Sequence, residues 1–248
     1  MAVLLFWLTV WELLSLLVDR ALLLPGPLAV AARLYALAKT AGFWETIALS
    51  LLRIAGAVAA GILLGTLLAV LAARSGLLRA LLTPLLSVVK ATPVASFIIL
   101  TLLFLGRNLV PPFTAVLIVL PVVFGGVEAG ISAVDPLLLE LAAVYRLPAA
   151  RRLRRIYVPA VLPQFLAAVR TSIGLAWKAG VAAEVLTVPL RSIGRSLYTA
   201  KLNLETTDLF AWTAVTILCS VLLEKLTMTA FGRLERRKGR EKQDDDAL

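Results

Sequence analysis

The sequence predicts an all-α integral membrane protein, a bundle of about six transmembrane helices with a cytoplasmic helical hairpin between the fourth and the fifth. The first observation is composition: of 248 residues, 60% are hydrophobic and only 16% are charged, with a mean hydropathy of +0.94. A soluble domain of this length needs a larger charged surface, so lipid is the simplest solvent for it. The other two observations are the lengths of the apolar segments and the positions of the basic residues between them.

The apolar segments have the length that a membrane-spanning helix needs, about 20 residues. Segments 54–73 and 108–127 contain no charged residue. Four further segments contain isolated charges, namely 2–18, 80–105, 157–186 and 209–231. We therefore expect one transmembrane domain over residues 1–235, followed by a charged, disordered tail over 236–248.

The first segment resembles a signal peptide in length, but its composition favours a retained helix. It lacks a basic start, it carries Glu12, and Trp7 and Trp11 suit the membrane interface. We expect it to remain as the first span.

The basic residues are distributed unequally between the two sides of the predicted bundle. With six spans, one side carries 13 lysines and arginines and the other carries 7. The larger set includes five arginines between the fourth and fifth spans: Arg146, Arg151, Arg152, Arg154 and Arg155. The positive-inside rule places this side and both termini in the cytoplasm. The same distribution accounts for the net charge of +10 without a nucleic-acid partner.

Among the charged residues within or near the apolar segments we single out Arg53, Glu128, Lys178 and Glu184. A charge at membrane depth costs about 2.5–3.5 kcal/mol on insertion scales, so such residues usually face the protein interior or a water-filled path. Both interpretations, a structural ion pair and a path lining, stay open. The preferred pair is Arg53 with Glu184, which requires the second and fifth helices to be neighbours.

Glycines recur at the spacing that brings helices close together. Gly61 and Gly65 form one pair, and Gly126 and Gly130 form another. Small residues four apart let helix backbones approach each other. We favour packing within one chain over a seam between two copies.

The segment 135–159 predicts a short helical hairpin. Asp135 followed by Pro136 is a typical helix start, an N-cap acceptor before a proline at the first helical position. The first helix should run to about Tyr145, and Pro148 should begin a second one over 149–158, with two further prolines marking entry to the next span. The first limb is apolar and needs a bundle or a partner to cover it.

The segment 189–208 is the longest polar stretch on the predicted outer side. It reads either as an ordinary loop or as a loop with a short amphipathic helix near 193–200. In the second interpretation it is a contact for an external delivery protein.

The hairpin resembles the cytoplasmic loop of permease subunits in binding-protein-dependent ABC importers, in the branch that includes nitrate, sulfonate and taurine permeases. The family signature begins Glu-Ala-Ala, has glycine six positions after the glutamate and ends in Ile-x-Leu-Pro. Here Glu140-Leu141-Ala142 matches the start of the signature and Ile156-Tyr157-Val158-Pro159 matches its end, and the spacing between them fits without an insertion or deletion. Arg146 stands at the glycine position and Pro148 follows it. The resemblance extends over about residues 20–235, through segments 24–27, 46–65, 81–106, 131–136 and 176–186.

The resemblance implies that the hairpin is a coupling helix seated on a cytoplasmic ATP-binding subunit. The residues implied in this contact are Glu140, Leu141, Ala142, Ala143, Arg146, Pro148, Ile156 and Pro159. It further implies an extracytoplasmic solute-binding protein, a second permease copy, and a place in the inner membrane of a prokaryote. The solute would be small, and an anion is a candidate because Arg53, Arg107 and Lys178 suit one electrostatically.

No enzymatic function is expected of this chain. It has no G-x-x-x-x-G-K-[ST] phosphate loop, so ATP hydrolysis would occur on another chain. It has no histidine and one cysteine, Cys219, so we expect no metal, no cofactor and no nucleophile–base pair. The alternatives left open are a stand-alone secondary transporter or channel and, less favoured, an integral membrane enzyme.

Overall fold

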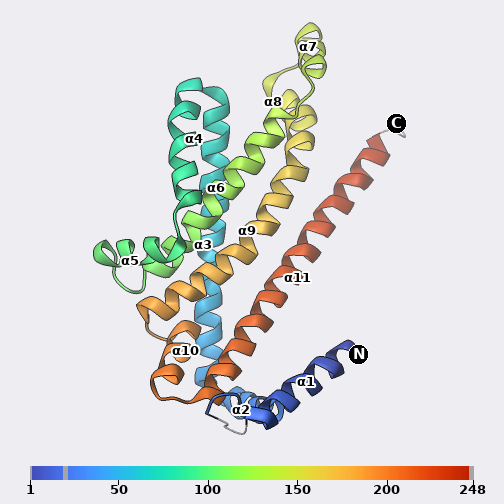
Figure 1. Ribbon diagram of the computed structural model, residues 1–248. Coiled ribbons are helices and arrows are strands. Elements are labelled where there is room, and N and C mark those ends of the chain that lie inside the picture. The colour runs from blue at the N-terminus through green and yellow to red at the C-terminus, as the bar shows by residue number, and fades with distance from the viewer. Residues whose placement is uncertain (1, 19–21, 246–248) are drawn as a thin grey trace.

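A computed structural model describes residues 2–18 and 22–245, and for residues 4, 228 and 230–245 it describes the backbone alone (Figure 1). All regular secondary structure in this part of the chain is helical. The elements are α1 (Ala2–Val18), α2 (Pro27–Ala38), α3 (Ala41–Arg74), α4 (Gly76–Ala91), α5 (Val94–Phe104), α6 (Val110–Ser132), α7 (Pro136–Val144), α8 (Ala149–Arg152), the π-helical turn η1 (Leu153–Tyr157), α9 (Val158–Thr187), α10 (Ile193–Leu202) and α11 (Thr206–Asp245).

Four helical runs among the described residues are long and apolar enough to cross a membrane: Ala41–Arg74, Val110–Ser132, Ala149–Thr187 and Thr206–Thr227. A fifth span exists if α4 and α5, which are bent by 106° at a short break, count as one. The remaining expected span, which α1 forms at the start of the chain, is an apolar helix of 17 residues and is shorter than the other spans. The prediction of about six spans is therefore roughly met, with two of the six shorter or broken.

The prediction of one continuous helix over 80–105 is wrong. The chain leaves the helix at Thr92, whose backbone is extended at φ −78° and ψ 130°, and Pro93 precedes the next helix. Proline disfavours the helical conformation of the residue before it, which accounts for the break at this point.

The core of the bundle is formed by α3, α6 and α9. The two glycine pairs allow the backbones of these helices to approach one another closely. A Cβ built on Gly61 would lie 2.7 Å from Val119 Cβ, and one on Gly65 would lie 2.7 Å from the Leu120 carbonyl oxygen, both on α6. A Cβ on Gly130 would lie 2.6 Å from Val161 Cα on α9. Gly126 meets Ala168 of α9 in the same way. Both pairs thus pack helices of one chain, as favoured from the sequence.

The two ends of the bundle differ in their elements. The α7 turn, which comprises α7 and the residues after it up to Pro148, lies at one end, and α1, α2 and α10 lie at the other (Figure 1). At this second end the Phe43 and Trp212 rings lie 5.2 Å apart between centroids, and Arg33 of α2 pairs with Asp208 of α11. The helix α2 was not anticipated from the sequence. It begins with Pro27 at its first position, which suits a helix start.

The hairpin differs from its prediction in the second limb. The first limb is α7, as expected, but α8, η1 and α9 form one helical run, Ala149–Thr187, instead of a separate short helix. Pro159 lies in the first turn of α9 and Pro163 lies inside it. The π-helical turn directly before them shifts the hydrogen-bond register, a local adjustment by which membrane helices accommodate proline.

The C-terminal helix α11 continues to Asp245, across the boundary expected at residue 236. A disordered tail over 236–248 stays a prediction, and its last three residues lie outside the described part of the chain.

Candidate functional site

The α7 turn presents an apolar helix that the rest of the described chain leaves mostly uncovered. Its start follows the predicted cap: the Leu137 N–H donates to Asp135 Oδ1 at 2.9 Å. Exposed fractions are 65% for Leu137, 50% for Leu141 and 78% for Val144, and within α7 only Ala142 is buried. Apolar surface of this kind needs lipid or a protein partner to cover it.

Arg146 occupies the left-handed position that ends α7. Its φ is +48°, the Arg146 N–H donates to the Ala143 carbonyl at 3.0 Å, and the Leu147 N–H donates to the Ala142 carbonyl at 2.9 Å. These two bonds define a Schellman motif, in which glycine is the usual residue at the left-handed position. The turn therefore keeps the geometry that glycine favours, although an arginine, for which this conformation costs about 1–2 kcal/mol, stands there.

The eight residues expected to couple to an ATP-binding subunit fall into two groups. Six of them lie on α7 or in the turn after it, and of these all but Ala142 are exposed: Glu140, Leu141, Ala142, Ala143, Arg146 and Pro148. Ile156, half-buried, and Pro159, exposed, lie further along the helical run that leads into the membrane. The structure thus gathers the first six on α7 and its turn, five of them exposed, and leaves the last two further along the chain.

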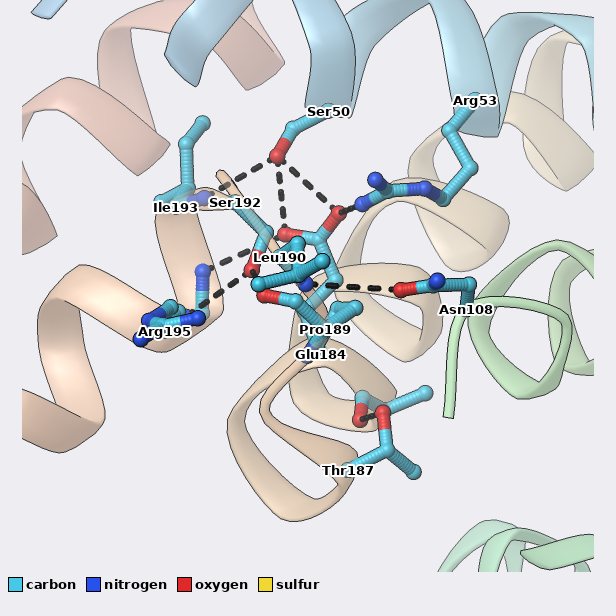
Figure 2. Close-up of polar contacts among 12 residues, drawn as sticks. Ser50, Arg53, Asn108, Glu184, Thr187, Pro189, Leu190, Ser192, Ile193 and Arg195 are labelled. Carbon is cyan, nitrogen blue, oxygen red and sulfur yellow. Dashed lines mark hydrogen bonds and ion pairs between the residues drawn. The ribbon is translucent and has the colours of Figure 1, made fainter. Parts of the chain in front are cut away.

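At the opposite end, Glu184 of α9 lies at the centre of a buried polar cluster (Figure 2). Its side chain is fully buried, and Arg53 of α3 donates from Nη1 to Oε1 at 2.6 Å. The Ser50 Oγ lies 2.9 Å from each carboxylate oxygen, and the Gly194 N–H donates to Oε2 at 3.2 Å. The structure therefore brings together the pair preferred from the sequence, across neighbouring second and fifth spans.

The cluster fixes the first turn of α10 against α3 and α9. The Ile193 N–H donates to Ser50 Oγ at 3.0 Å, and the Arg195 N–H donates to Ser192 Oγ at 3.0 Å, which caps the helix. A side chain at Gly194 would overlap the backbone of Glu184, so only glycine allows this approach. The amphipathic helix considered for 193–200 is present, and its start is buried instead of lying in a surface loop.

The cluster satisfies a carboxylate that would otherwise be costly to bury. A buried charge is tolerated when its partner has good geometry and further hydrogen bonds occupy its remaining lone pairs. Sequence reasoning missed the roles of Ser50 and Gly194. Ser50 precedes Arg53 by three residues, so both lie on one face of a helix, which was an available signal. The donor from Gly194 had no signal in the sequence.

The other two charges singled out in the sequence do not join this cluster. Glu128 of α6 accepts from Arg79 Nε of α4 at 2.8 Å, an ion pair that ties the start of α4 to α6. Lys178 is exposed on α9, and among the residues whose side chains are described no ion pair involves it.

An open cavity of about 500 Å³ lies beside the cluster, at the end of the bundle opposite α7. Its lining combines basic and acidic side chains with Trp212 and comes from segments 190–200 and 205–212 and from Thr46 of α3. Arg191, which lines it, also pairs with Glu45 of α3.

One end of this helical membrane bundle is tied together by a buried ion pair, and the other end carries an apolar helix that the described chain leaves uncovered. This arrangement is expected of a membrane subunit that binds partner proteins. Residues 61–240 match the family described as "Binding-protein-dependent transport system inner membrane component". The chain belongs to this family, and it is a transmembrane permease subunit of an ABC importer.

Curated relatives lie in the branch expected from the sequence. The taurine transport system permease protein TauC of Escherichia coli (strain K12) is 27% identical over 86% of this chain and 80% of its own length. The bicarbonate transport system permease protein CmpB of Synechococcus elongatus is 27% identical over 78% of this chain and 73% of its own length. The putative aliphatic sulfonates transport permease protein SsuC of Bacillus subtilis (strain 168) is 27% identical over 92% and 82%.

The fold also matches that of a solved transporter. A crystal structure of an amino acid ABC transporter with histidines superimposes with a TM-score of 0.58, over 77% of this chain and 90% of the other, at 19% identity. At this identity the likeness shows the fold.

Proposed function

We propose that this permease receives the motion of a separate ATP-binding subunit at the α7 turn and, with a second permease copy, moves a small solute that carries an oxyanion. The observation that carries the proposal is the uncovered apolar face of α7, with Leu141 50% and Val144 78% exposed, in a chain that belongs to an importer family. Water disfavours such a face, and an ATP-binding subunit with a groove would cover it.

The helical run Ala149–Thr187 supplies a mechanical link from the turn to the other end. It has 39 residues, which corresponds to about 58 Å at 1.5 Å per residue. Its far end holds Glu184, and through this carboxylate it is joined to α3 and α10. A displacement at the turn therefore reaches the opposite end through one continuous element, as a two-state switch biased by nucleotide requires.

The proposed orientation places the α7 turn and both termini in the cytoplasm. The five arginines at and after this turn and the basic residues of the C-terminal segment support this orientation through the positive-inside rule. The open cavity beside the Glu184 cluster then faces outward, where a solute-binding protein would dock against α10 and the start of α11.

The proposed solute class follows from what the relatives share. Their names specify taurine, bicarbonate and aliphatic sulfonates, each a small molecule with a single oxyanion group.

Co-purification of the ATP-binding subunit from detergent-solubilised membranes tests the proposal. Leu141→Asp should reduce the amount recovered at least about tenfold, because it places a charge in the buried centre of the contact. Leu204→Asp is the matched control, since Leu204 is 73% exposed and follows α10 at the opposite end. Equal recovery with both variants, or ion-gradient-driven uptake without any ATP-binding subunit, would overturn it.

A further inference from the structure

Lys90 and Lys178 project from membrane-spanning segments without a partner in the described part of the chain. Lys225 of α11 does so too, but it lies two residues before the end of the apolar run Thr206–Thr227, where a lysine side chain reaches the interface. Lys90 lies one residue before the end of α4, and Lys178 lies within α9; both are exposed. No hydrogen bond or ion pair to either ammonium is present among the described side chains. A lysine directed at lipid is costly, so at this depth it indicates a neighbouring protein or a water-filled path.

The surroundings of Lys178 are not those of a lipid-facing surface. Between residues 164 and 182 the exposed positions of α9 are Gln164, Ala167, Arg170, Thr171, Leu175, Lys178 and Ala182. Six of these seven side chains are small, polar or charged. By contrast, the exposed apolar side chains of α11 include Ile217, Leu218, Val221, Leu222 and Leu226, which is the composition that lipid favours.

Lys90 lies at an interruption of the backbone inside a membrane segment. The helix stops at Ala91 and resumes at Val94 after a bend of 106°, and both Ala91 and Pro93 are exposed. Non-helical backbone at membrane depth is tolerated only where protein buries it or where it lines a water-filled cavity. The break and the lysine beside it thus point independently to the same environment.

The helix α6 connects the two positions. A Cβ built on Gly125 would lie 3.5 Å from Lys90 Nζ, and the next residue, Gly126, packs on Ala168 of α9. Lys178 lies ten residues beyond Ala168, or about 15 Å further along α9. The two ammonium groups therefore lie at two levels of the membrane, separated by about half the thickness of its hydrocarbon core.

From these observations we infer that Lys90 and Lys178 line the water-filled translocation path at two successive levels and select for anionic solutes. The inference deepens the proposed function and rests on it for the second copy that would complete the path. Two cations at separate levels keep an anion favoured along the path without one tight site that would retain it.

The test measures the charge preference of the path at a position between the two lysines. Thr171 lies on the exposed stripe of α9, three residues beyond the level of Ala168. A Thr171→Cys, Cys219→Ala variant is treated, in membranes of cells that carry the whole transporter, with an anionic sulfonatoethyl and a cationic trimethylammonioethyl methanethiosulfonate. The ratio of the two rates is normalised to the ratio at Leu204→Cys, which is exposed at the opposite end from α7.

The thiol at position 171 should react faster with the anionic reagent. Adding Lys90→Met or Lys178→Met should lower the normalised ratio by about fivefold, a change expected when one unit charge is removed nearby in a medium of intermediate dielectric. Lys178→Arg should preserve the ratio, and Lys225→Met, which removes an exposed lysine of α11, should leave it unchanged. An unreactive thiol, or a ratio insensitive to both Lys→Met changes, would overturn the inference. Because recovery of the ATP-binding subunit with Leu141→Asp is measured separately, failure here is distinguishable from failure of the proposed function.

Discussion

The α7 turn and the Glu184 cluster are both junctions between helices, and both include residues with positive φ, Arg146 in one and Val188 and Arg191 in or beside the other. They differ in what completes them. Glu184 is fully buried and accepts hydrogen bonds from two other helices of the same chain, α3 and α10, whereas α7 leaves Leu137, Leu141 and Val144 at least half exposed. The difference indicates that the Glu184 cluster holds the bundle together, whereas the α7 turn is available for contact with a partner.

The largest effect is expected from breaking the buried ion pair. Arg53→Met leaves the Glu184 carboxylate without its counter-charge, and it should lower the free energy of unfolding by about 3–5 kcal/mol. The measurement is thermal unfolding of the purified protein in detergent. Glu128→Gln is the control, since the Arg79–Glu128 pair is more exposed, with 59% of the Arg79 and 27% of the Glu128 side chain accessible, and its loss should cost about 1 kcal/mol or less.

The double variant Arg53→Met, Glu184→Gln sharpens this prediction. It removes both charges and should recover part of the loss, because a neutral amide can still bond to Ser50 and the Gly194 N–H. A double variant no more stable than Arg53→Met alone would contradict the view that the unpaired charge is the cause.

A smaller effect is expected from the glycines of the core. Gly126→Ala would force a methyl group against Ala168 and should destabilise the protein by about 1–3 kcal/mol. Gly56→Ala is the matched control on α3, because no atom lies within 4 Å of a Cβ at that position. It should be neutral or stabilising by up to about 1 kcal/mol through helix propensity. Equal effects in the same unfolding measurement would show that the close approach of α6 and α9 is not the constraint.

The smallest effect is expected at the α7 turn. Arg146→Gly removes the strain of a left-handed arginine and should stabilise the turn by about 1 kcal/mol, whereas Arg146→Val should destabilise it. Hydrogen exchange of the Leu147 amide, which donates to Ala142, reports the change locally. Faster exchange in the glycine variant would contradict the Schellman geometry.

The sequence predicts the parts of the fold that depend on local residue patterns, and those that follow from the small number of charged residues in the membrane. Asp135 before Pro136 specifies a helix start by itself, and the glycine pairs specify close helix contacts. The pairing of Arg53 with Glu184 was predictable because a chain with few intramembrane charges offers few partners.

Other features depend on context that the sequence does not reveal. Pro84, Pro121 and Pro163 all lie inside helices, whereas Pro93 follows a break, and nothing in the residue type distinguishes them. The left-handed conformation at the end of α7 was hidden because an arginine stands where glycine would have indicated it. The approach of Gly194 to Glu184 follows from tertiary packing between segments that no local pattern connects.

The central claim is that the uncovered α7 turn and the Glu184 end lie on opposite sides of the membrane, with the turn in the cytoplasm. In a Cys219→Ala background, Val144→Cys and Leu204→Cys place single thiols at exposed positions of the two ends, 78% and 73% exposed in the native residues. A membrane-impermeant thiol reagent added to intact cells should label position 204 at once and position 144 only after the membrane is permeabilised. Labelling of position 144 in intact cells would contradict the account.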